Sequence, residues 1–238
     1  MNNLKKNLSY LEICKIHTEG SGIITSIKSY LQRELDSGIS SIPISKQIFS
    51  LDYKSLESFR IDICNCHRCA LAKTRTNIVF GHGNNDAKLL FIGDIPSAED
   101  DKDGIPFIDD AGLLLTKIIK SIGLTRDDVY LCNVLKCYNS KESSSLNDEI
   151  IACRDFLSEQ IRLIQPEIIL CLGFVPAQVL LQTNMPLDKL RGKFHQLILN
   201  NRISVVVTYH PRTLLLSPEK KILVWEDMKM LKSRLNLP

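Results

Sequence analysis

The 238-residue sequence contains no long hydrophobic run. Its longest apolar stretch, residues 168–177, is far shorter than the roughly 18 residues that indicate a membrane-spanning helix. The basic N-terminus lacks an apolar core and a small-residue cleavage site, so we expect a cytoplasmic protein that has no membrane partner. The Gly-x-Gly-x-x-Gly pattern is also missing, which argues against a nicotinamide or flavin enzyme.

Strong net charge is absent as well. The chain has 30 Lys and Arg residues against 27 Asp and Glu residues, and the resulting +3 does not by itself indicate a nucleic-acid partner. The distribution is uneven, because residues 186–238 carry 10 basic and 4 acidic side chains. This basic segment fits a phosphate-contacting face, and it also fits a solvated helix with its loops.

Residues 1–60 are interpreted as a separate N-terminal extension, helical or partly disordered. The spacing of an amphipathic helix is met by Ile24, Ile27, Leu31 and Leu35. A stretch rich in Gly and Ser then indicates a linker. The extension fits an appendage without chemistry, and it also fits a helix that binds a replication or repair partner.

Residues 61–238 alternate short apolar segments with helical stretches, which is typical of an α/β domain. Buried strands are predicted at 88–93, 128–133, 167–173 and 203–209. Helices are predicted at 111–122, at 147–164 with Asn147 as N-cap, at 176–182, and from Pro218 to about residue 235. We expect a three-layer α/β/α fold around a central, mainly parallel four-stranded sheet. Residues 193–200 are expected to form a hairpin with the last strand, and ligands should bind at the carboxyl ends of the strands.

Eight cysteines are many for a cytosolic chain. Disulfides are rare in reducing compartments, so metal binding or catalysis becomes the leading question. Cys132 and Cys171 lie within strand-like segments and are interpreted as core thiols. Cys14 has no other cysteine near it in the sequence.

The remaining cysteines fit a four-sulfur metal site. Cys66 and Cys69 form a Cys-x2-Cys pair in a polar loop, and Cys137 and Cys153 lie outside the strands. Four thiolates suit zinc or an iron–sulfur cluster, and the spacing does not choose between them. Cys64 is an alternative ligand, and unligated thiols are the alternative to a metal site.

Several segments, taken in order, carry a family resemblance. They are CHRC at 66–69, GDIPSAEDDKDGIPFIDDAGLLL at 93–115, NVLKC at 133–137, IACRDFL at 151–157, LRG at 190–192 and TYHPRTLL at 208–215. From about residue 60 to 235, this set closely resembles the family 4 uracil-DNA glycosylases, the iron–sulfur type. The resemblance implies a monomeric, monofunctional enzyme of base excision repair that hydrolyses uracil from DNA and leaves an abasic site. It also implies a structural [4Fe–4S] cluster on Cys66, Cys69, Cys137 and Cys153.

The resemblance implies a role for each residue of the site. Phe107 would stack on the flipped uracil. Asn133 would read the base, because an amide offers one donor and one acceptor. His210 would donate a hydrogen bond to the departing anion. Asp94 would place negative charge near the sugar and orient water, and Gly93 would let the backbone approach the base.

The sequence departs from the family pattern in its first motif. Asp94 and Asp100, the second also expected at the substrate, replace longer glutamates, and Ser97 and Asp109 replace glycines. We expect Ser97 to strain a turn that prefers glycine, and the shortened acids to misplace water. These changes motivate an alternative, a catalytically weakened homologue that binds DNA or a replication partner. A third hypothesis is an iron–sulfur redox protein without a DNA role.

Phosphate contacts should hold the DNA without reading its sequence. Arg191 and Lys193 in and beside the LRG segment, and Arg212 after His210, are the expected contacts. Leu190 or Leu214 is expected to fill the gap that the flipped base leaves.

Overall fold

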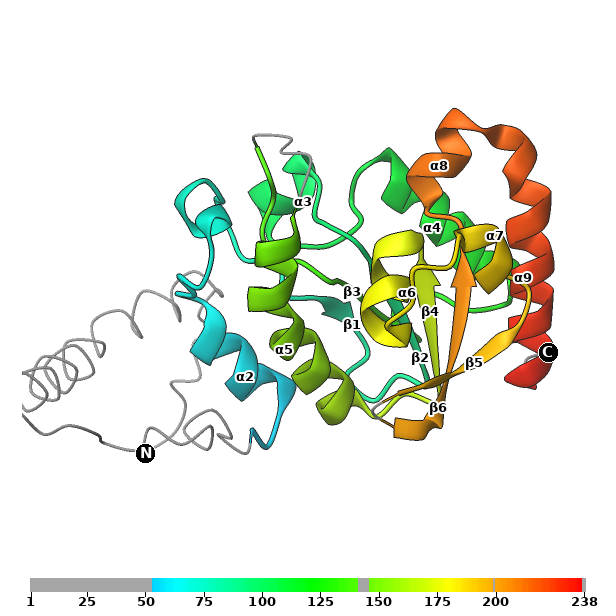
Figure 1. Cartoon of the computed structure of the whole chain (residues 1–238), viewed down its shortest axis with the longest axis horizontal. Helices are drawn as coiled ribbons and strands as arrows, with labels where there is room; N and C mark the ends of the chain where they lie inside the picture. Colours follow the sequence, from blue (N-terminus) through cyan, green and yellow to red (C-terminus); the bar gives the residue numbers. More distant parts are fainter. Residues whose placement is uncertain (1–52, 141–145, 199, 237–238) are drawn as a thin grey trace, which may run out of the picture. The chain divides into compact units, whose positions relative to one another are not determined.

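The computed structural model describes residues 53–140, 146–198 and 200–236 (Figure 1). The chain divides into two units, Met1–Cys66 and His67–Pro238. In the described part of the first unit, helix α2 spans Leu56–Ile63, and Ser55 caps it by accepting a hydrogen bond from the Ser58 amide at 3.2 Å. The helix predicted around residues 24–35 lies outside the described residues. Among the described helices, none is both long and apolar enough to cross a membrane.

The second unit is built on a mixed six-stranded sheet with the order β1-β3-β2-β4-β6-β5. Four central strands run parallel: β2 (Leu89–Gly93), β3 (Tyr130–Asn133), β4 (Ile168–Leu172) and β6 (Asn200–Thr208). Two edge strands, β1 (His82–Gly83) and β5 (Phe194–Leu197), pair antiparallel with their neighbours. The predicted parallel core and the hairpin of β5 with β6 are confirmed. The two-residue β1 was not predicted, because so short a strand has no periodic pattern.

Helices and helical turns connect the strands. They are η2 (Ala70–Lys73), α3 (Ala98–Asp103), α4 (Asp110–Ser121), α5 (Asn147–Ile164), α6 (Phe174–Leu181), α7 (Leu187–Leu190), α8 (Pro211–Leu216), η3 (Pro218–Lys220) and α9 (Lys221–Arg234). The predicted N-cap of α5 is wrong, because Leu146 occupies that position and Asn147 is the first helical residue. Pro218 opens the short η3 turn, and α9 itself begins at Lys221.

The helices cover both faces of the sheet, and α5 and α6 lie on the face opposite α4 and α9 (Figure 1). On the α4 and α9 side, Phe91, Leu131, Leu170 and Val206 pack in one core with helix residues such as Leu115. Burial of these apolar side chains stabilises the layers, by about 25 cal/mol for each Å² removed from water. The three-layer α/β/α prediction is confirmed.

The parallel order brings the carboxyl ends of β2, β3, β4 and β6 to one edge of the sheet. Gly93 and Asn133 are directly paired, one at the end of β2 and the other at the end of β3. His210 follows the end of β6. Three segments that are far apart in the sequence therefore deliver their polar residues to the same place.

Candidate active site

Gly93, Asn133 and Phe107 enclose a tight space at the carboxyl ends of β2 and β3. A Cβ atom on Gly93 would lie 2.4 Å from Asn133 Oδ1 and 2.6 Å from Phe107 Cζ. These separations are shorter than any ordinary contact, so only glycine leaves the amide and the ring both in reach of a ligand. The three residues were predicted to form the base-binding pocket, and the structure brings them together.

The Asn133 amide is buried without a partner. The residue is 1% exposed, and its Oδ1 and Nδ2 atoms have no hydrogen-bond partner among the described residues. An unmet buried polar group costs about 1–3 kcal/mol, so native proteins keep few of them. Here the amide retains one donor and one acceptor for a ligand.

The backbone beneath this amide is held by residues that sequence reasoning missed. The buried Lys136 ammonium donates to the Asn133 carbonyl at 2.6 Å and to Gln160 Oε1 at 2.5 Å. Gln160 Nε2 donates in turn to the Phe80 carbonyl at 2.8 Å. The end of β3 is thereby fixed through hydrogen bonds to α5 and to the segment before β1. The NVLKC motif contains Lys136, but no local spacing indicates its contact with α5.

Phe107 has a strained backbone, with a φ of 58°, which a bulky residue rarely adopts. Arg126 holds it from one side, because its guanidinium donates to the carbonyls of Pro106 at 2.9 Å and Phe107 at 3.0 Å. On the other side, the Ile108 amide donates to Asp100 Oδ1 at 2.9 Å. The ring is therefore placed by hydrogen bonds to its backbone, and no sequence motif indicated the part of Arg126 in them.

The helix after this turn needs glycine at position 112. A Cβ on Gly112 would lie 1.8 Å from the Phe107 carbonyl oxygen, so only glycine lets the first turn of α4 approach the strained residue.

His210 caps helix α8 and faces Asp94. Its Nδ1 accepts a hydrogen bond from the Arg212 amide at 3.1 Å. In the neutral ring the proton therefore lies on Nε2, which is 3.6 Å from Asp94 Oδ1. Burial lowers the pKa of His210, and the nearby Asp94 carboxylate opposes that effect. The Phe107 ring centroid is 6.1 Å from that of His210, so a neutral N–H donor lies beside the predicted base-binding pocket.

The altered residues of the first motif have structural partners. Ser97 has a φ of −75°, so the strain expected at this glycine-preferring turn is wrong. Its hydroxyl accepts from the Asp100 amide, while Asp100 Oδ2 accepts from the Ser97 amide, each at 3.1 Å. This reciprocal pair is a capping box that starts α3. Both Asp100 oxygens thus accept from backbone amides beneath the pocket.

Asp109 caps the next helix, α4, because its Oδ1 accepts from the Gly112 amide at 2.9 Å. Its other oxygen lies 3.6 Å from the Arg212 guanidinium, which is half-exposed. The carboxylate that replaces the family glycine therefore joins the turn of Phe107 to the helix of His210.

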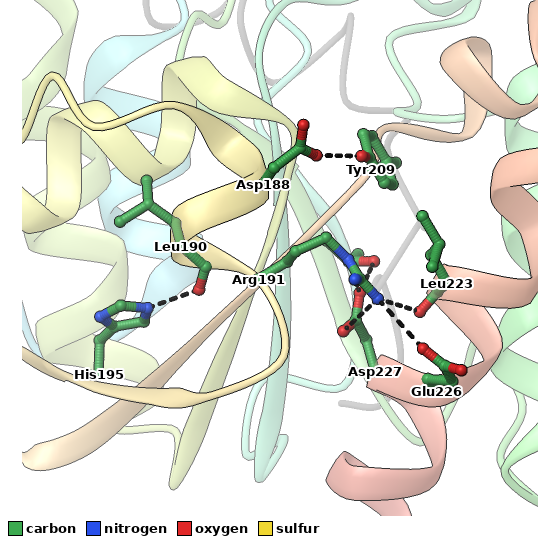
Figure 2. A network of polar contacts seen from close by, with 9 residues as sticks. Asp188, Leu190, Arg191, His195, Tyr209, Leu223, Glu226 and Asp227 are labelled. Carbon is green, nitrogen blue, oxygen red and sulfur yellow. Dashed lines mark hydrogen bonds and ion pairs between the residues drawn. The ribbon is translucent and has the colours of Figure 1, made fainter.

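The residues expected at the DNA differ in their surroundings. Arg191 points inward and binds the Asp227 carboxylate and the Leu223 carbonyl (Figure 2). Lys193 is exposed. Leu190 and Leu214 are 2% and 1% exposed, so the expectation that either fills the gap in DNA is wrong. The helical register of α8 turns Leu214 into the core and leaves Leu216 83% exposed.

Three of the four predicted metal ligands lie in the second unit. Cys69 precedes η2, Cys137 follows β3, and Cys153 belongs to α5. Burial raises the pKa of the Cys137 thiol to about 12, Arg75 opposes this, and the Cys153 and Cys69 thiols add to it. The Arg75 guanidinium lies 3.6 Å from Cys137 Sγ. The three thiols thus lie within electrostatic reach of one another, beside a cation.

Among the described residues, no three His, Cys, Asp or Glu side chains form a group that could hold a metal ion. The donor set consists of cysteine thiols, which suit an iron–sulfur cluster or a zinc ion. Cys132 and Cys171 are fully buried core thiols, as predicted.

Two hollows lie away from this edge of the sheet. One of about 710 Å³ is lined by residues of α5, α6 and β5, and one of about 570 Å³ by the end of α5 and the start of β6. Neither is lined by the segments that follow β2, β3 or β6. Chemistry rather than size therefore identifies the candidate site.

Known proteins are similar to this chain in sequence. Residues 80–229 match the family model described as the uracil DNA glycosylase superfamily. The type-4 uracil-DNA glycosylase of Archaeoglobus fulgidus is 35% identical over 181 residues, which cover 74% of this chain and 91% of that protein. Those of Saccharolobus solfataricus and Thermotoga maritima are 37% and 38% identical over 76% and 71% of this chain, and over 87% and 88% of their own lengths. The chain belongs to the uracil-DNA glycosylase superfamily, in its type-4 family.

Proposed function

We propose that this protein is a uracil-DNA glycosylase, which hydrolyses the bond between uracil and deoxyribose and leaves an abasic site. The observation that carries the proposal is the buried amide of Asn133, which makes no hydrogen bond within the described part of the chain. Uracil offers it a carbonyl at C4 and an N–H at N3, so Nδ2 donates to one and Oδ1 accepts from the other. Cytosine presents the opposite pair, and the amide would meet donor against donor and acceptor against acceptor.

The pocket compensates for the cost of removing a base from the stack. Extrusion costs a few kcal/mol, and a pocket recovers it through stacking and hydrogen bonds. Phe107 supplies the ring, and the hydrogen bonds to its backbone fix the ring before the base arrives. Gly93 gives the base room beside the Asn133 amide.

Bond cleavage needs charge stabilised on both sides of the breaking bond. The C1′–N1 bond breaks, and its electron pair passes to uracil. His210 Nε2–H donates to the O2 oxygen of uracil, where negative charge develops, and its neutral state makes it a donor that keeps its proton. Asp94 stabilises the positive charge on the sugar. A water held by Asp94 adds to C1′ and gives up a proton to this carboxylate.

Exposed cations on the segments around β6 hold the phosphates. We assign this role to Lys193 and to Arg212, whose side chain is half-exposed. Arg191 is engaged within the protein and holds its loop in place. The exposed Leu215 and Leu216 at the end of α8 replace Leu190 and Leu214 as candidates for filling the gap in the duplex.

We further propose that a [4Fe–4S] cluster is held by Cys69, Cys137 and Cys153, with Cys66 assigned from the Cys-x2-Cys spacing alone. The cluster would supply a cross-link between segments, without a part in bond cleavage. Arg68 packs at 4.3 Å over the Phe156 ring of α5, which places the segment before Cys69 against the helix that carries Cys153. Arg75 would offset the negative charge of the thiolates.

The glycosylase proposal is tested with anaerobically purified protein and one labelled oligonucleotide that contains a single uracil. Alkali-sensitive breakage at uracil, and none in a thymine control, is the expected result. An absence of breakage by folded, iron-loaded protein would refute it and favour the DNA-binding homologue.

The cluster is tested without reference to activity. Cys137→Ala should lose iron, lose visible absorption and melt at a lower temperature. Cys171→Ala, a fully buried thiol of β4, is the matched control and should keep its iron. Full iron content in Cys137→Ala would contradict the assignment and transfer the ligand role to another thiol, with Cys64 the first to test.

A further inference from the structure

A buried carboxylate on α9 joins the two segments that flank the candidate site. Asp227 is 1% exposed and lies in no motif that the sequence indicated. Its two oxygens accept hydrogen bonds from Arg191, in the loop after α7, and from Thr208, at the end of β6 (Figure 2). Burial raises the pKa of Asp227, and the contacts with Thr208, Arg191 and the Gly192 backbone oppose that effect. One side chain therefore connects a helix, a loop and a strand end.

Arg191 and Asp227 form a bidentate ion pair. Its Nε atom lies 3.2 Å from Asp227 Oδ2, and its terminal nitrogen lies 3.0 Å from Oδ1. The same terminal nitrogen donates to the Leu223 carbonyl at 2.6 Å. Paired hydrogen bonds of this kind fix the guanidinium plane as well as its distance. The loop that presents Lys193 is thus fastened to α9.

The Thr208 contact reaches the catalytic segment. Thr208 Oγ1 donates to Asp227 Oδ2 at 2.7 Å, and Thr208 is two residues before His210. The Thr208 carbonyl accepts from the Gly173 amide at 2.9 Å, so the strand end is held through both side chain and backbone. Tyr209 adds a second link between the same segments, because its hydroxyl bonds to Asp188 of α7 (Figure 2).

We propose that Asp227 is a positioning residue for uracil excision, setting the place of His210 through Thr208 and the place of the Lys193 loop through Arg191. This inference rests on the proposed function. It follows because a hydrogen-bond donor must stand at a fixed point to stabilise the leaving anion, and a displacement of about 1 Å can cost about a hundredfold in rate. Asp227 touches neither reactant, so it acts through its contacts with Thr208 and Arg191.

The contacts of Asp227 with Thr208 and with Arg191 can be removed one at a time. Thr208→Val removes the link to the catalytic strand and keeps its shape, and Arg191→Gln removes the link to the DNA-contacting loop. Asp227→Asn weakens both at constant volume. Glu226→Gln is the matched control, because it removes one carboxylate charge at the adjacent position, from an exposed side chain 3.9 Å from Arg191.

The readouts are the single-turnover rate at saturating enzyme and the Kd for DNA carrying an abasic-site analogue. Thr208→Val should lower the rate about tenfold and change the Kd less than twofold, while Arg191→Gln should weaken binding more than it slows cleavage. Asp227→Asn should do both, and Glu226→Gln neither. The NMR titration of the His210 ring should move in Thr208→Val and Asp227→Asn.

Wild-type rate and Kd in a folded Asp227→Asn protein would overturn the inference. So would losses that vanish when the assay is cooled well below the melting temperature, because a merely structural carboxylate would act through unfolding alone. If the wild-type protein does not cleave uracil, the proposed function fails by itself. The Kd and the His210 titration still decide whether Asp227 positions the two segments.

Discussion

Two polar centres, one around Asn133 and one around Asp227, lie near the carboxyl edge of the sheet. They differ in how many of their hydrogen-bonding groups already have a partner. Around Asn133 the amide has no partner among the described residues, and the His210 and Asp94 side chains approach without a close hydrogen bond. Around Asp227 the carboxylate accepts from two side chains, at 2.7–3.2 Å. The first centre leaves the Asn133 amide and the Nε2 atom of His210 available to a ligand, and the second has already used its oxygens to hold the fold.

The difference indicates where binding energy is available. A preorganised, unsatisfied group interacts more strongly with the transition state than a group that must first release a partner. Changes in the first centre should therefore alter rate and selectivity, while changes in the second should alter stability or geometry. Three of the predictions below set one residue against a counterpart whose hydrogen bonds or ion pairs are already made.

The largest effect is expected from His210. His210→Ala removes the donor to the leaving anion, so the single-turnover rate should fall on the order of 10²–10³-fold. DNA affinity should change less than about twofold, because the contact forms mainly in the transition state. His195 is the counterpart, since its Nε2 is already bonded to the Leu190 carbonyl at 2.7 Å. His195→Ala should lower the melting temperature and leave the rate within about threefold.

The pH profile gives an independent check on the same residue. Because burial lowers the pKa of His210, the ring stays neutral below the ordinary histidine pKa of about 6.5. Protonation at Nδ1 would break its bond from the Arg212 amide. The rate attributable to this group should hold level from pH 7 to 6.5 and decline only at lower pH. A decline centred above pH 6.5 would contradict the neutral donor.

Asn133→Asp should alter selectivity. A carboxylate cannot donate to uracil O4, so uracil cleavage should fall about a hundredfold, and the preference for uracil over cytosine should shrink. The measurement is the ratio of single-turnover rates on uracil and cytosine oligonucleotides. Asn77 is the counterpart with a satisfied amide, donating to the Asp101 and Lys102 carbonyls at 2.9 Å each. Asn77→Asp should cost stability and keep the ratio, and an unchanged ratio in Asn133→Asp would remove Asn133 from base reading.

Arg126 tests whether hydrogen bonds made within the protein are needed to position the Phe107 ring at the candidate site. Arg126→Met releases the Pro106 and Phe107 carbonyls, so the strained Phe107 backbone can relax and the ring loses its fixed place. We expect cleavage at low substrate concentration to fall about tenfold. Arg126→Lys should restore only part of it, because one ammonium lacks the planar fork that reaches both carbonyls. Wild-type activity in the methionine variant would show that these hydrogen bonds are dispensable.

The sequence predicted the parts of the fold that depend on local patterns. Four apolar segments became the parallel core, and their order placed Gly93, Asn133 and His210 at one edge. The ordered motifs indicated the candidate site residues, and the roles of these residues stay predictions. A fine boundary failed at Asn147, because the N-cap position is occupied by Leu146 and no side chain caps the start of α5, so no polar residue marks that position in the sequence.

Residues that act across long sequence separations were not predicted. Arg126 reaches back to Phe107, Lys136 reaches forward to Gln160, and Asp227 joins Arg191 to Thr208. No periodicity or spacing encodes such contacts, because they depend on how the layers pack. The choice of Leu214 for the DNA gap failed for a related reason, since the register of α8 decides which leucine faces outward.

The smallest effect is expected from Lys193. This exposed residue lies in the same loop as Arg191, whose side chain is already bound to Asp227. Lys193→Ala removes an exposed cation, so the Kd for uracil-containing DNA should rise about two- to threefold. The slope of log affinity against log salt should fall in magnitude by about 1, because one phosphate contact is lost. Lys88→Ala is the control, since Lys88 pairs with Glu167 at the amino ends of the strands. An unchanged slope in Lys193→Ala would place the DNA elsewhere, because a lysine that meets no phosphate releases no counterion.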